Sequence, residues 1–465
     1  MDQPGVRIER DSLGEVRVPA DALWGAQTER ARQNFQVGER RLPPPFLRAL
    51  ARIKAACARA NAELGQLEPG LAEAIAAAAD EVASGAHAEQ FPLPVLQTGS
   101  GTSSNMNMNE VLARLAGRRL GDEGRVHPND HVNRGQSSND VIPSAIHVAA
   151  ALELSRQLLP AAEHLERTLL AKAHEVQDVV KTGRTHLMDA VPLRMSQEVG
   201  AWAWQVREAR QRLEGCLPRL QLLALGGTAV GTGLNAHPEL GQRAAARLAQ
   251  ATGILFAPAP DRFARIGAQD AALELSGQLR GLAAVLLKLS DDLRWLNAGP
   301  LGGPGEIALP ALQPGSSIMP GKVNPVIPEA AAMAAVLVFG HDAALTHAAQ
   351  AARFQLHTML PLVADLVLES IQLLAGACRS LADQAVAGFL VRRERIAAAL
   401  ARNPILATAL APEIGYDAAA EVAKRAAREE RPVLDVALEM TGLSEARLRE
   451  LLDSARLADG GVTSG

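Results

Sequence analysis

The chain has 465 residues, of which 48% are hydrophobic, 21% charged and only 3% aromatic. This length exceeds what one ordinary core fills, so two or three domains or one elongated helical bundle are expected. With few aromatics, the core has to be built from Leu, Ala, Val and Ile, which suits close helix–helix packing. The net charge of −4 and the lack of a Lys/Arg run exclude the basic surface that nucleic-acid binding requires.

The cysteines and the N-terminus indicate a cytoplasmic protein. Cys57, Cys216 and Cys378 are far apart, odd in number and outside any CxxC pattern, which predicts reduced, buried thiols. The first residues, MDQPGVRIERDSLG, lack the charged-then-apolar order of a secretory signal. No run of about 20 apolar residues stands out, so we expect no membrane span.

The first part of the chain, residues 1–138, mixes short helical stretches with Gly/Pro-rich and polar segments. It ends around the motifs HPND and QSSND. We predict an N-terminal, mainly helical domain here.

Residues 139–393 are dominated by long helical patterns. One stripe, with Pro160 as a break or kink within it, consists of Leu158, Leu165, Leu169 and Val176. A longer stripe alternates steps of four and three: Leu275, Leu279, Leu282, Leu286, Leu289, Leu293 and Leu296. A third helical stretch covers about residues 361–386. Such helices have more apolar surface than one chain covers, which predicts a central bundle that extends beyond one subunit.

Residues 394–465 form shorter patterns, which predict a small helical C-terminal domain. A final helix is expected from Ser444, which has a weak capping-box signal because Arg447 replaces the usual Glu. The last residues, ADGGVTSG, are expected to be disordered.

The segment GSSIMPGKVNP, residues 315–325, carries the strongest chemical signal. Its glycines and prolines forbid a regular helix or a central strand, so its backbone has to run as turns with N–H groups free to face a ligand. A phosphate loop requires four residues between its glycines and Ser or Thr after the Lys, whereas here five intervene and Val323 follows Lys322. We interpret the segment as a carboxylate clamp with a candidate serine base.

Five blocks of the chain, in order, resemble class II fumarases of the fumarase/aspartase superfamily. Besides GSSIMPGKVNP, they are TGSGTSSNMNMNE, HPNDHVNRGQSSND, KTGRTHLMDAVP and GGTAVGTGLN. The resemblance covers nearly the whole chain. It implies a mostly α, three-domain fold with a long helical bundle shared across a homotetramer, and an active site assembled from three subunits. It also implies reversible hydration of fumarate to (S)-malate in the tricarboxylic acid cycle, without a cofactor.

The resemblance assigns His186 to the proton of the water that leaves or adds, with Glu329 as its carboxylate partner. A carboxylate fixes the tautomer of an imidazole and raises its proton affinity, so the pair is a sound acid/base unit. Aspartases carry Gln where this chain has His186, which favours water over ammonia as the leaving group. One segment, Gln355-Leu356-His357, departs from the fumarase pattern ELN, and its effect does not follow from the sequence.

The resemblance assigns Ser316 to removal of the C3 proton of malate. Loop N–H groups and Lys322 would lower the pKa of its hydroxyl, whereas without the family Ser316 and Ser317 read as turn caps. The product of this step is an aci-carboxylate dianion, which needs preorganised donors. The matching substrate-binding positions are Ser100, Gly101, Thr102, Ser137, Ser138, Asn139, Thr185, Ser317, Lys322, Val323 and Asn324.

A second dicarboxylate site near the entrance is implied at His127, Pro128, Asn129 and Asp130, although Asn-Asp after Pro also signals a simple turn. His131 stands where fumarases commonly have Asp, which would make this entrance less acidic. No HExxH motif, Cys/His cluster or dinucleotide glycine spacing is present, so neither metal nor cofactor is predicted. Two alternatives stay open, an aspartate ammonia-lyase and a non-catalytic structural or binding relative.

Overall fold

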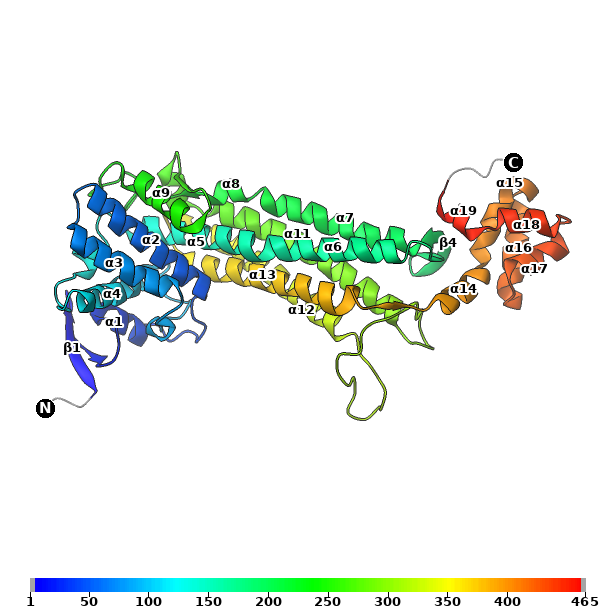
Figure 1. Cartoon of the computed structure of the whole chain (residues 1–465), viewed down its shortest axis with the longest axis horizontal. Coiled ribbons are helices and arrows are strands. Elements are labelled where there is room, and N and C mark those ends of the chain that lie inside the picture. The colour runs from blue at the N-terminus through cyan, green and yellow to red at the C-terminus, as the bar shows by residue number, and fades with distance from the viewer. Residues whose placement is uncertain (1–4, 461–465) are drawn as a thin grey trace. The chain divides into compact units, whose positions relative to one another are not determined.

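Figure 1 shows the computed structural model, in which residues 5–460 are described. Helices make up most of this part of the chain, and its strands form only small two-stranded sheets. Two compact units can be separated. One comprises the segments up to Pro160, Arg210–Ala283 and Ala334–Ala375, and the other comprises Ala161–Ala209, Ala284–Met333 and the segment from Gly376 onward. The three-domain division proposed from the sequence stays a prediction.

The first unit is built around a long helix that the sequence did not delineate. Helix α2 (Pro44–Glu63) begins with two prolines, whose missing N–H groups and fixed φ suit the first helical turn. It packs against α3, α5 and α9. The expectation of only short helices here was wrong, because α2 has 20 residues and α4 has 18. The other elements are β1 (Val6–Asp11), β2 (Gly14–Pro19), α1 (Ala26–Asn34), α3 (Pro69–Ala83), η1 (Ala88–Gln90), α4 (Thr102–Arg119), η2 (Pro128–Val132), α5 (Ser138–Glu153), α8 (Leu217–Leu220), β5 (Leu222–Leu223), α9 (Leu240–Thr252), β6 (Ala257–Pro258), α10 (Arg262–Gly267), β8 (Ala352–Arg353) and β9 (Leu356–His357).

The predicted break at Pro160 is confirmed as a change of helix type. A five-residue π turn, η3 (Leu154–Leu158), separates α5 from α6 (Leu159–Glu175), and Pro160 is the second residue of α6. Proline has no N–H and its ring crowds the carbonyl one turn earlier, so the wider turn relieves the conflict.

The leucine stripe of the sequence is confirmed in α11 (Asp270–Asn297), where all seven leucines are buried. The helix ends where Gly299 and Pro300 follow, since neither residue continues a helix easily. The third predicted stretch matches α13 (Leu360–Leu381) and the π turn η4 (Ala382–Val386). Two further long helices, α7 (Met195–Glu214) and α12 (Val326–Ala349), were not delineated from the sequence.

Helices α12 and α13 are both long and apolar enough to cross a membrane by length and composition alone, which the sequence analysis did not anticipate. In α13, 72% of the apolar window is buried inside the protein, as in the core helix of a globular fold. In α12 only 28% is buried. Its buried stripe repeats every three or four residues, and its other side leaves apolar residues uncovered: Met333, Val336 and Leu337.

The C-terminal part of the second unit is a set of short helices around its own apolar cluster. Its status as a separate domain stays a prediction. Ser444 caps α18 (Glu445–Leu451) by accepting a hydrogen bond from the backbone N–H of Arg447. This helix is not the last, because α19 (Ser454–Ala458) follows it. The predicted disorder of the final residues falls largely on residues 461–465, outside the described part. The remaining elements are β3 (Val180–Thr185), β4 (Met188–Arg194), β7 (Ile307–Ala308), β10 (Leu390–Val391), α14 (Arg393–Ala401), η5 (Pro404–Leu410), α15 (Ala411–Ile414), α16 (Tyr416–Glu429) and α17 (Val433–Met440).

All three cysteines are free and buried, as the sequence predicted. Burial raises the pKa of the Cys57 and Cys378 thiols to about 12, because a thiolate is poorly solvated there. These thiols are therefore unreactive core residues.

Candidate active site

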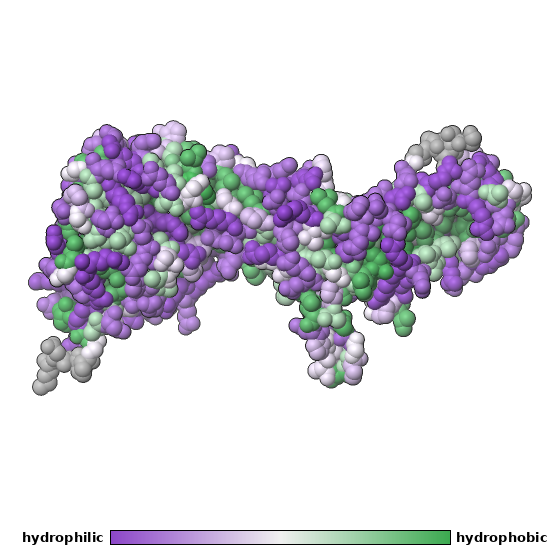
Figure 2. Space-filling model, viewed as in Figure 1, coloured by the Kyte–Doolittle hydropathy of each residue, from purple (hydrophilic) through white to green (hydrophobic). Residues whose placement is uncertain are grey.

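The segment 315–325 is a loop of turns without helix or strand, as its glycines and prolines predicted, and α12 begins directly after it. It extends away from the helices that flank it (Figure 1). Its surface mixes hydrophilic and hydrophobic residues, with Ile318 84% exposed (Figure 2). The loop closes on itself at its neck, where Gly315 N–H donates to Lys322 O at 2.9 Å and Asn324 Nδ2 donates to Gly315 O at 2.7 Å.

Ser316 accepts two backbone hydrogen bonds inside this loop. The N–H groups of Ile318 and Met319 donate to its Oγ at 3.2 and 3.1 Å. This is the turn-capping role that the sequence left open for Ser316. The same two donors also stabilise negative charge on that oxygen, which is what a serine base requires. The expectation that the loop's N–H groups are free to face a ligand was therefore wrong for these two, and also for those of Gly315 and Lys322, which donate to loop carbonyls.

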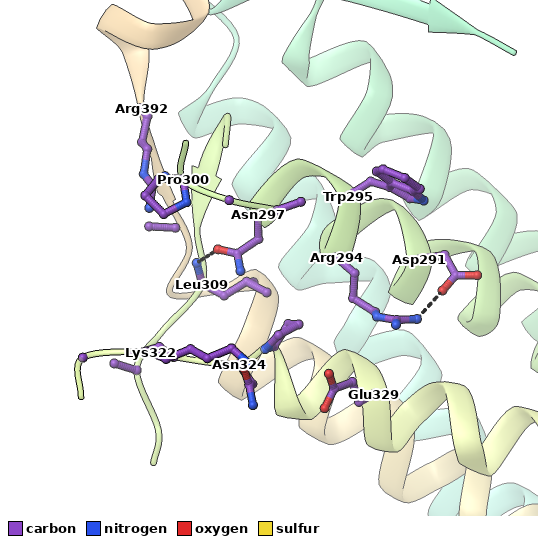
Figure 3. A pocket seen from close by; sticks show the side chains of 17 residues that line it. Asp291, Arg294, Trp295, Asn297, Pro300, Leu309, Lys322, Asn324, Glu329 and Arg392 are labelled. Atoms are coloured by element: carbon purple, nitrogen blue, oxygen red, sulfur yellow. Dashed lines mark hydrogen bonds and ion pairs between the residues drawn. The ribbon is translucent and has the colours of Figure 1, made fainter. Parts of the chain in front are cut away.

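The end of the loop lines a cavity of about 810 Å3. Lys322, Val323 and Asn324 line it from the loop, and Glu329 lines it from the first turn of α12 (Figure 3). These four predicted residues are brought together. Ser316 and Ser317 are not among the described residues that line this cavity.

The cavity also contains charged residues that the sequence analysis missed. Arg294 and Asp291 are ion-paired at 2.8 Å on α11, and Arg392 lines the wall close to Pro300 (Figure 3). With Lys322 and Glu329, the lining holds three cations and two anions. Arg294 and Asp291 lie between the leucines of α11, where a charge looks like part of an ordinary solvated helix face. No spacing in the sequence distinguishes them.

His186 and Leu187 form a two-residue hairpin loop between β3 and β4, in which Thr185 pairs with Met188. Both loop residues have positive φ, 56° and 62°, as a type I′ turn requires. Neither is the Asn, Asp or Gly that normally adopts this conformation, so the turn is strained. Backbone strain of this kind persists only where the surrounding structure stabilises it, and it is common at functional sites.

A buried ionic cluster anchors this hairpin. The Lys181 ammonium, 1% exposed, lies 2.8 Å from Glu198 Oε2 and 2.7 Å from Glu306 Oε2. Arg184 donates to the other oxygen of Glu306, and this bond together with the charge of Glu306 holds the pKa of Arg184 above its usual value against desolvation. Glu306 directly precedes β7, whose Ala308 lines the cavity. The cluster therefore connects the His186 hairpin to the cavity wall.

Ser100, Gly101 and Thr102 form the turn that starts α4. The Ser100 and Thr102 hydroxyls are hydrogen-bonded to each other at 2.9 Å. Gly101 has φ 71°, and a Cβ there would come within 2.9 Å of Ile142 on α5, so a side chain is excluded.

The departing segment Gln355-Leu356-His357 leads directly into the residues that support this turn. A Cβ on Gly99 would lie 1.9 Å from the Thr358 carbonyl oxygen, and Leu360 N–H donates to Gly99 O at 2.8 Å. His357 itself is buried, and burial lowers the pKa of its imidazole.

Ser137, Ser138 and Asn139 form the N-terminus of α5. Ser137 and Asp140 make a capping box. The Ser137 hydroxyl accepts a hydrogen bond from the backbone of the first helical turn, and the Asp140 carboxylate accepts one from the backbone N–H of Ser137. Asp140 also accepts from Gly226 N–H and Thr228 N–H, at 3.1 and 2.9 Å, which fixes the glycine-rich block against this turn. Burial raises the pKa of the Asp140 carboxyl to about 6 in spite of these bonds.

The predicted second site, His127, Pro128, Asn129 and Asp130, forms the start of the π turn η2. His127 Nδ1 accepts from Asp130 N–H at 3.1 Å, and His131 Nδ1 accepts from His127 N–H at 2.9 Å. His131, where a fumarase commonly has Asp, thus closes the turn. The segment borders a separate cavity of about 510 Å3.

Within the described chain, no hydrogen bond or ion pair connects His186 with Glu329. Thr185 and His186 are exposed at the tip of their hairpin. The described residues include no cluster of three or more His, Cys, Asp or Glu side chains placed to hold a metal ion. The pairing of His186 with Glu329 that the sequence predicted is therefore not made within the described part of one chain.

Comparison with known proteins gives matches along almost the whole chain. A family described as Lyase matches residues 14–340, and one described as Fumarase C C-terminus matches residues 406–459. Fumarate hydratase class II 2 of Pseudomonas aeruginosa is 60% identical over 456 residues, which cover 98% of this chain and 99% of that protein. The chain belongs to the class II fumarate hydratase family.

Two further relatives of this family extend the match in sequence and structure. Fumarate hydratase class II of Thermus thermophilus is 49% identical, with 97% of this chain and 98% of that protein covered. The crystal structure of a recombinant class II fumarase from Schistosoma mansoni matches with a TM-score of 0.94 at 37% identity, covering 97% of this chain and 99% of that one. The predicted mostly helical fumarase/aspartase-like fold is thus confirmed.

Proposed function

We propose that this protein is a fumarate hydratase that interconverts fumarate and (S)-malate by anti addition and elimination of water, in the tricarboxylic acid cycle. The observation that carries the proposal is 60% identity, along 98% of the chain, to a protein named fumarate hydratase class II. His186, Ser316, Lys322, Asn324 and Glu329 are all present as the chemistry requires. This speaks against a non-catalytic relative.

In the dehydration direction, Ser316 removes the C3 proton of malate. Two backbone N–H groups donate to its Oγ and stabilise the alkoxide form. The electrons of the C–H bond move into the adjacent carboxylate, which becomes an aci-carboxylate dianion. Lys322 and Asn324, with the hydroxyl and backbone donors of the predicted binding turns, stabilise that charge.

His186, oriented by Glu329, then protonates the departing C2 hydroxyl, so that water leaves. Because no hydrogen bond or ion pair joins these two residues in the described part of one chain, we propose that their contact forms between copies. In this arrangement each active site takes residues from three subunits of a homotetramer.

Helix α12 supports the proposed assembly. An apolar helix that is mostly uncovered exposes surface that water disfavours, and packing against equivalent helices removes it. We propose that α12 lies at the centre of the shared bundle. We further propose that the assembled enzyme is cytoplasmic, that its substrates are the small dicarboxylates fumarate and malate, and that the turn around His127 and Asp130 forms a second dicarboxylate site.

One spectrophotometric experiment tests the activity. The purified protein is given (S)-malate and, separately, aspartate, and the ultraviolet absorbance of fumarate is followed. We expect fumarate from malate alone. Fumarate from aspartate would identify an ammonia-lyase instead, and no product from either would leave only a non-catalytic role.

A further inference from the structure

The structure contains a buried lysine that the proposed chemistry does not use. Lys54 lies on α2 and is 0% exposed. Its ammonium donates to two side-chain amide oxygens, Asn133 Oδ1 and Gln136 Oε1, both at 2.9 Å. The two titratable groups that act on it are Asp140 and Cys57. Desolvation lowers the pKa of Lys54 to about 7, so keeping a cation here is costly.

The amide that binds Lys54 collects other donors as well. Asn133 Oδ1 also accepts from Asn105 Nδ2 at 3.2 Å and from Asn109 Nδ2 at 3.3 Å, both on α4. Asn105 Nδ2 in turn lies 3.0 Å from the Ser138 hydroxyl. Asn133 Nδ2 donates to Gln136 O, which closes the network on the segment before Ser137.

The residues of this network belong to the segments that carry both predicted substrate-binding turns of the first unit. Helix α4 starts at the Ser100–Thr102 turn, and α5 starts at Ser138 in the second turn. Asn133 and Gln136 lie between η2 and α5, so the network also borders the predicted second site. The single ammonium is thus bound where the segments leading to these turns meet.

We propose that Lys54 is a positioning residue of the substrate pocket: through Asn133, Asn105 and Gln136 it fixes the spacing between the Ser100–Thr102 and Ser137–Asn139 turns that hold a substrate carboxylate. This inference rests on the proposed function. A neutral side chain at this position would leave Gln136 Oε1 without its donor and would remove one of the three donors to Asn133 Oδ1. The two turns would then lose their fixed spacing, and substrate would bind more weakly.

The test is a comparison of Lys54→Met with Lys172→Met in malate dehydration. Lys172 is another buried lysine, 5% exposed, bound to Phe389 O and Glu175 and unconnected to any predicted site residue. We expect Lys54→Met to raise KM about tenfold or more while kcat per folded enzyme changes only about two- to threefold. Lys172→Met should lower thermal stability and leave KM unchanged.

A purely structural role for Lys54 predicts a different pattern, with less folded enzyme, a lower Tm and an unchanged KM. That result would overturn the inference. If Lys54→Met does not fold, Gln136→Met removes one acceptor and leaves the ammonium on Asn133, and it must raise KM in the same way. Wild-type protein that does not dehydrate malate would overturn the proposed function itself, whereas an active wild type with an unaltered KM in the variants would overturn only the role of Lys54.

Discussion

At the scale of single residues, Ser316 illustrates how one geometry serves two roles. Its Oγ accepts two backbone N–H bonds, which is an ordinary turn cap and equally the environment that an alkoxide needs. From the sequence, Ser316 could equally be a turn cap or a catalytic base. Only a kinetic experiment separates them.

Ser316→Ala should reduce the turnover of malate dehydration by about 100-fold or more, because the group that accepts the C3 proton is lost. The fold should persist, since the loop is exposed. Initial rates of fumarate formation provide the measurement. Ser84→Ala is the matched control, because Ser84 is an exposed serine at the end of α3 whose hydroxyl donates to Glu81 O. Near-normal turnover of Ser316→Ala would remove this residue from the mechanism.

His147 gives a prediction about stability and pH. It is buried on α5 beside Leu222 O, and burial together with Arg265 lowers the pKa of its imidazole to about 4. In the unfolded chain the His147 imidazole is protonated as the pH falls below about 6.5, whereas in the folded chain it is protonated only near pH 4. Stability should fall as pH drops through this window, by at most about 3 kcal/mol per subunit.

His147→Asn places an amide nitrogen near the position of Nδ1 and has no proton to bind. The free energy of unfolding of His147→Asn should therefore decrease less between pH 7 and pH 4 than that of the wild type. Urea unfolding at several pH values measures the difference. Parallel pH profiles of the two proteins would contradict the assignment.

At the scale of elements, the β3–β4 hairpin has a strained loop that carries the proposed acid/base residue. His186→Asn should preserve the hairpin, because Asn tolerates positive φ better than His. Turnover should nevertheless fall by about 100-fold or more, since an amide does not act as a general acid or base near neutral pH. Circular dichroism and malate kinetics measure the two effects.

Leu187→Gly is the control in the same loop. It relaxes the second strained position and keeps the imidazole, so stability should rise by about 0.5 kcal/mol with turnover largely retained. If both variants lost turnover equally, loop geometry rather than the imidazole would explain the loss of activity.

A helix or strand could be predicted from the sequence where its hydrophobic pattern was compatible with only one kind of element. The leucines of α11 repeat over the whole helix, so its position and buried face followed from spacing alone. Helix α12 is apolar on both sides, which hides the period of its buried stripe. The β1–β2 hairpin was missed because charged residues occupy half of its positions. Arg294 and Arg392 were missed because folding alone brings them to the cavity.

At the scale of the whole molecule, the exposed apolar side of α12 is the surface on which the proposed tetramer depends. Val336, 58% exposed in the single chain, should be buried among equivalent helices in the proposed tetramer. Val336→Glu would place a charge there, so the assembly should dissociate and activity should disappear with it. Sedimentation velocity gives the size and malate kinetics the activity. Leu438→Glu, on α17, is the control and should remain assembled. A fully active Val336→Glu monomer would contradict the shared site.

Mixed tetramers give an independent measurement. His186→Asn and Ser316→Ala are each expected to be inactive. If one pocket takes these two residues from different copies, coexpression should restore up to about a quarter of wild-type activity, because some pockets receive both intact residues. A mixture as inactive as its parents would mean that both residues belong to one copy.

The closed neck of the 315–325 loop has a mechanical consequence. The bonds from Gly315 N–H to Lys322 O and from Asn324 Nδ2 to Gly315 O join the two ends of the loop. Ser316 therefore lies within the same closed loop as Lys322, so a movement of the loop as a unit would carry the basic hydroxyl and the ammonium together. Closure over a bound dicarboxylate would then need no change in the two backbone bonds to Ser316 Oγ.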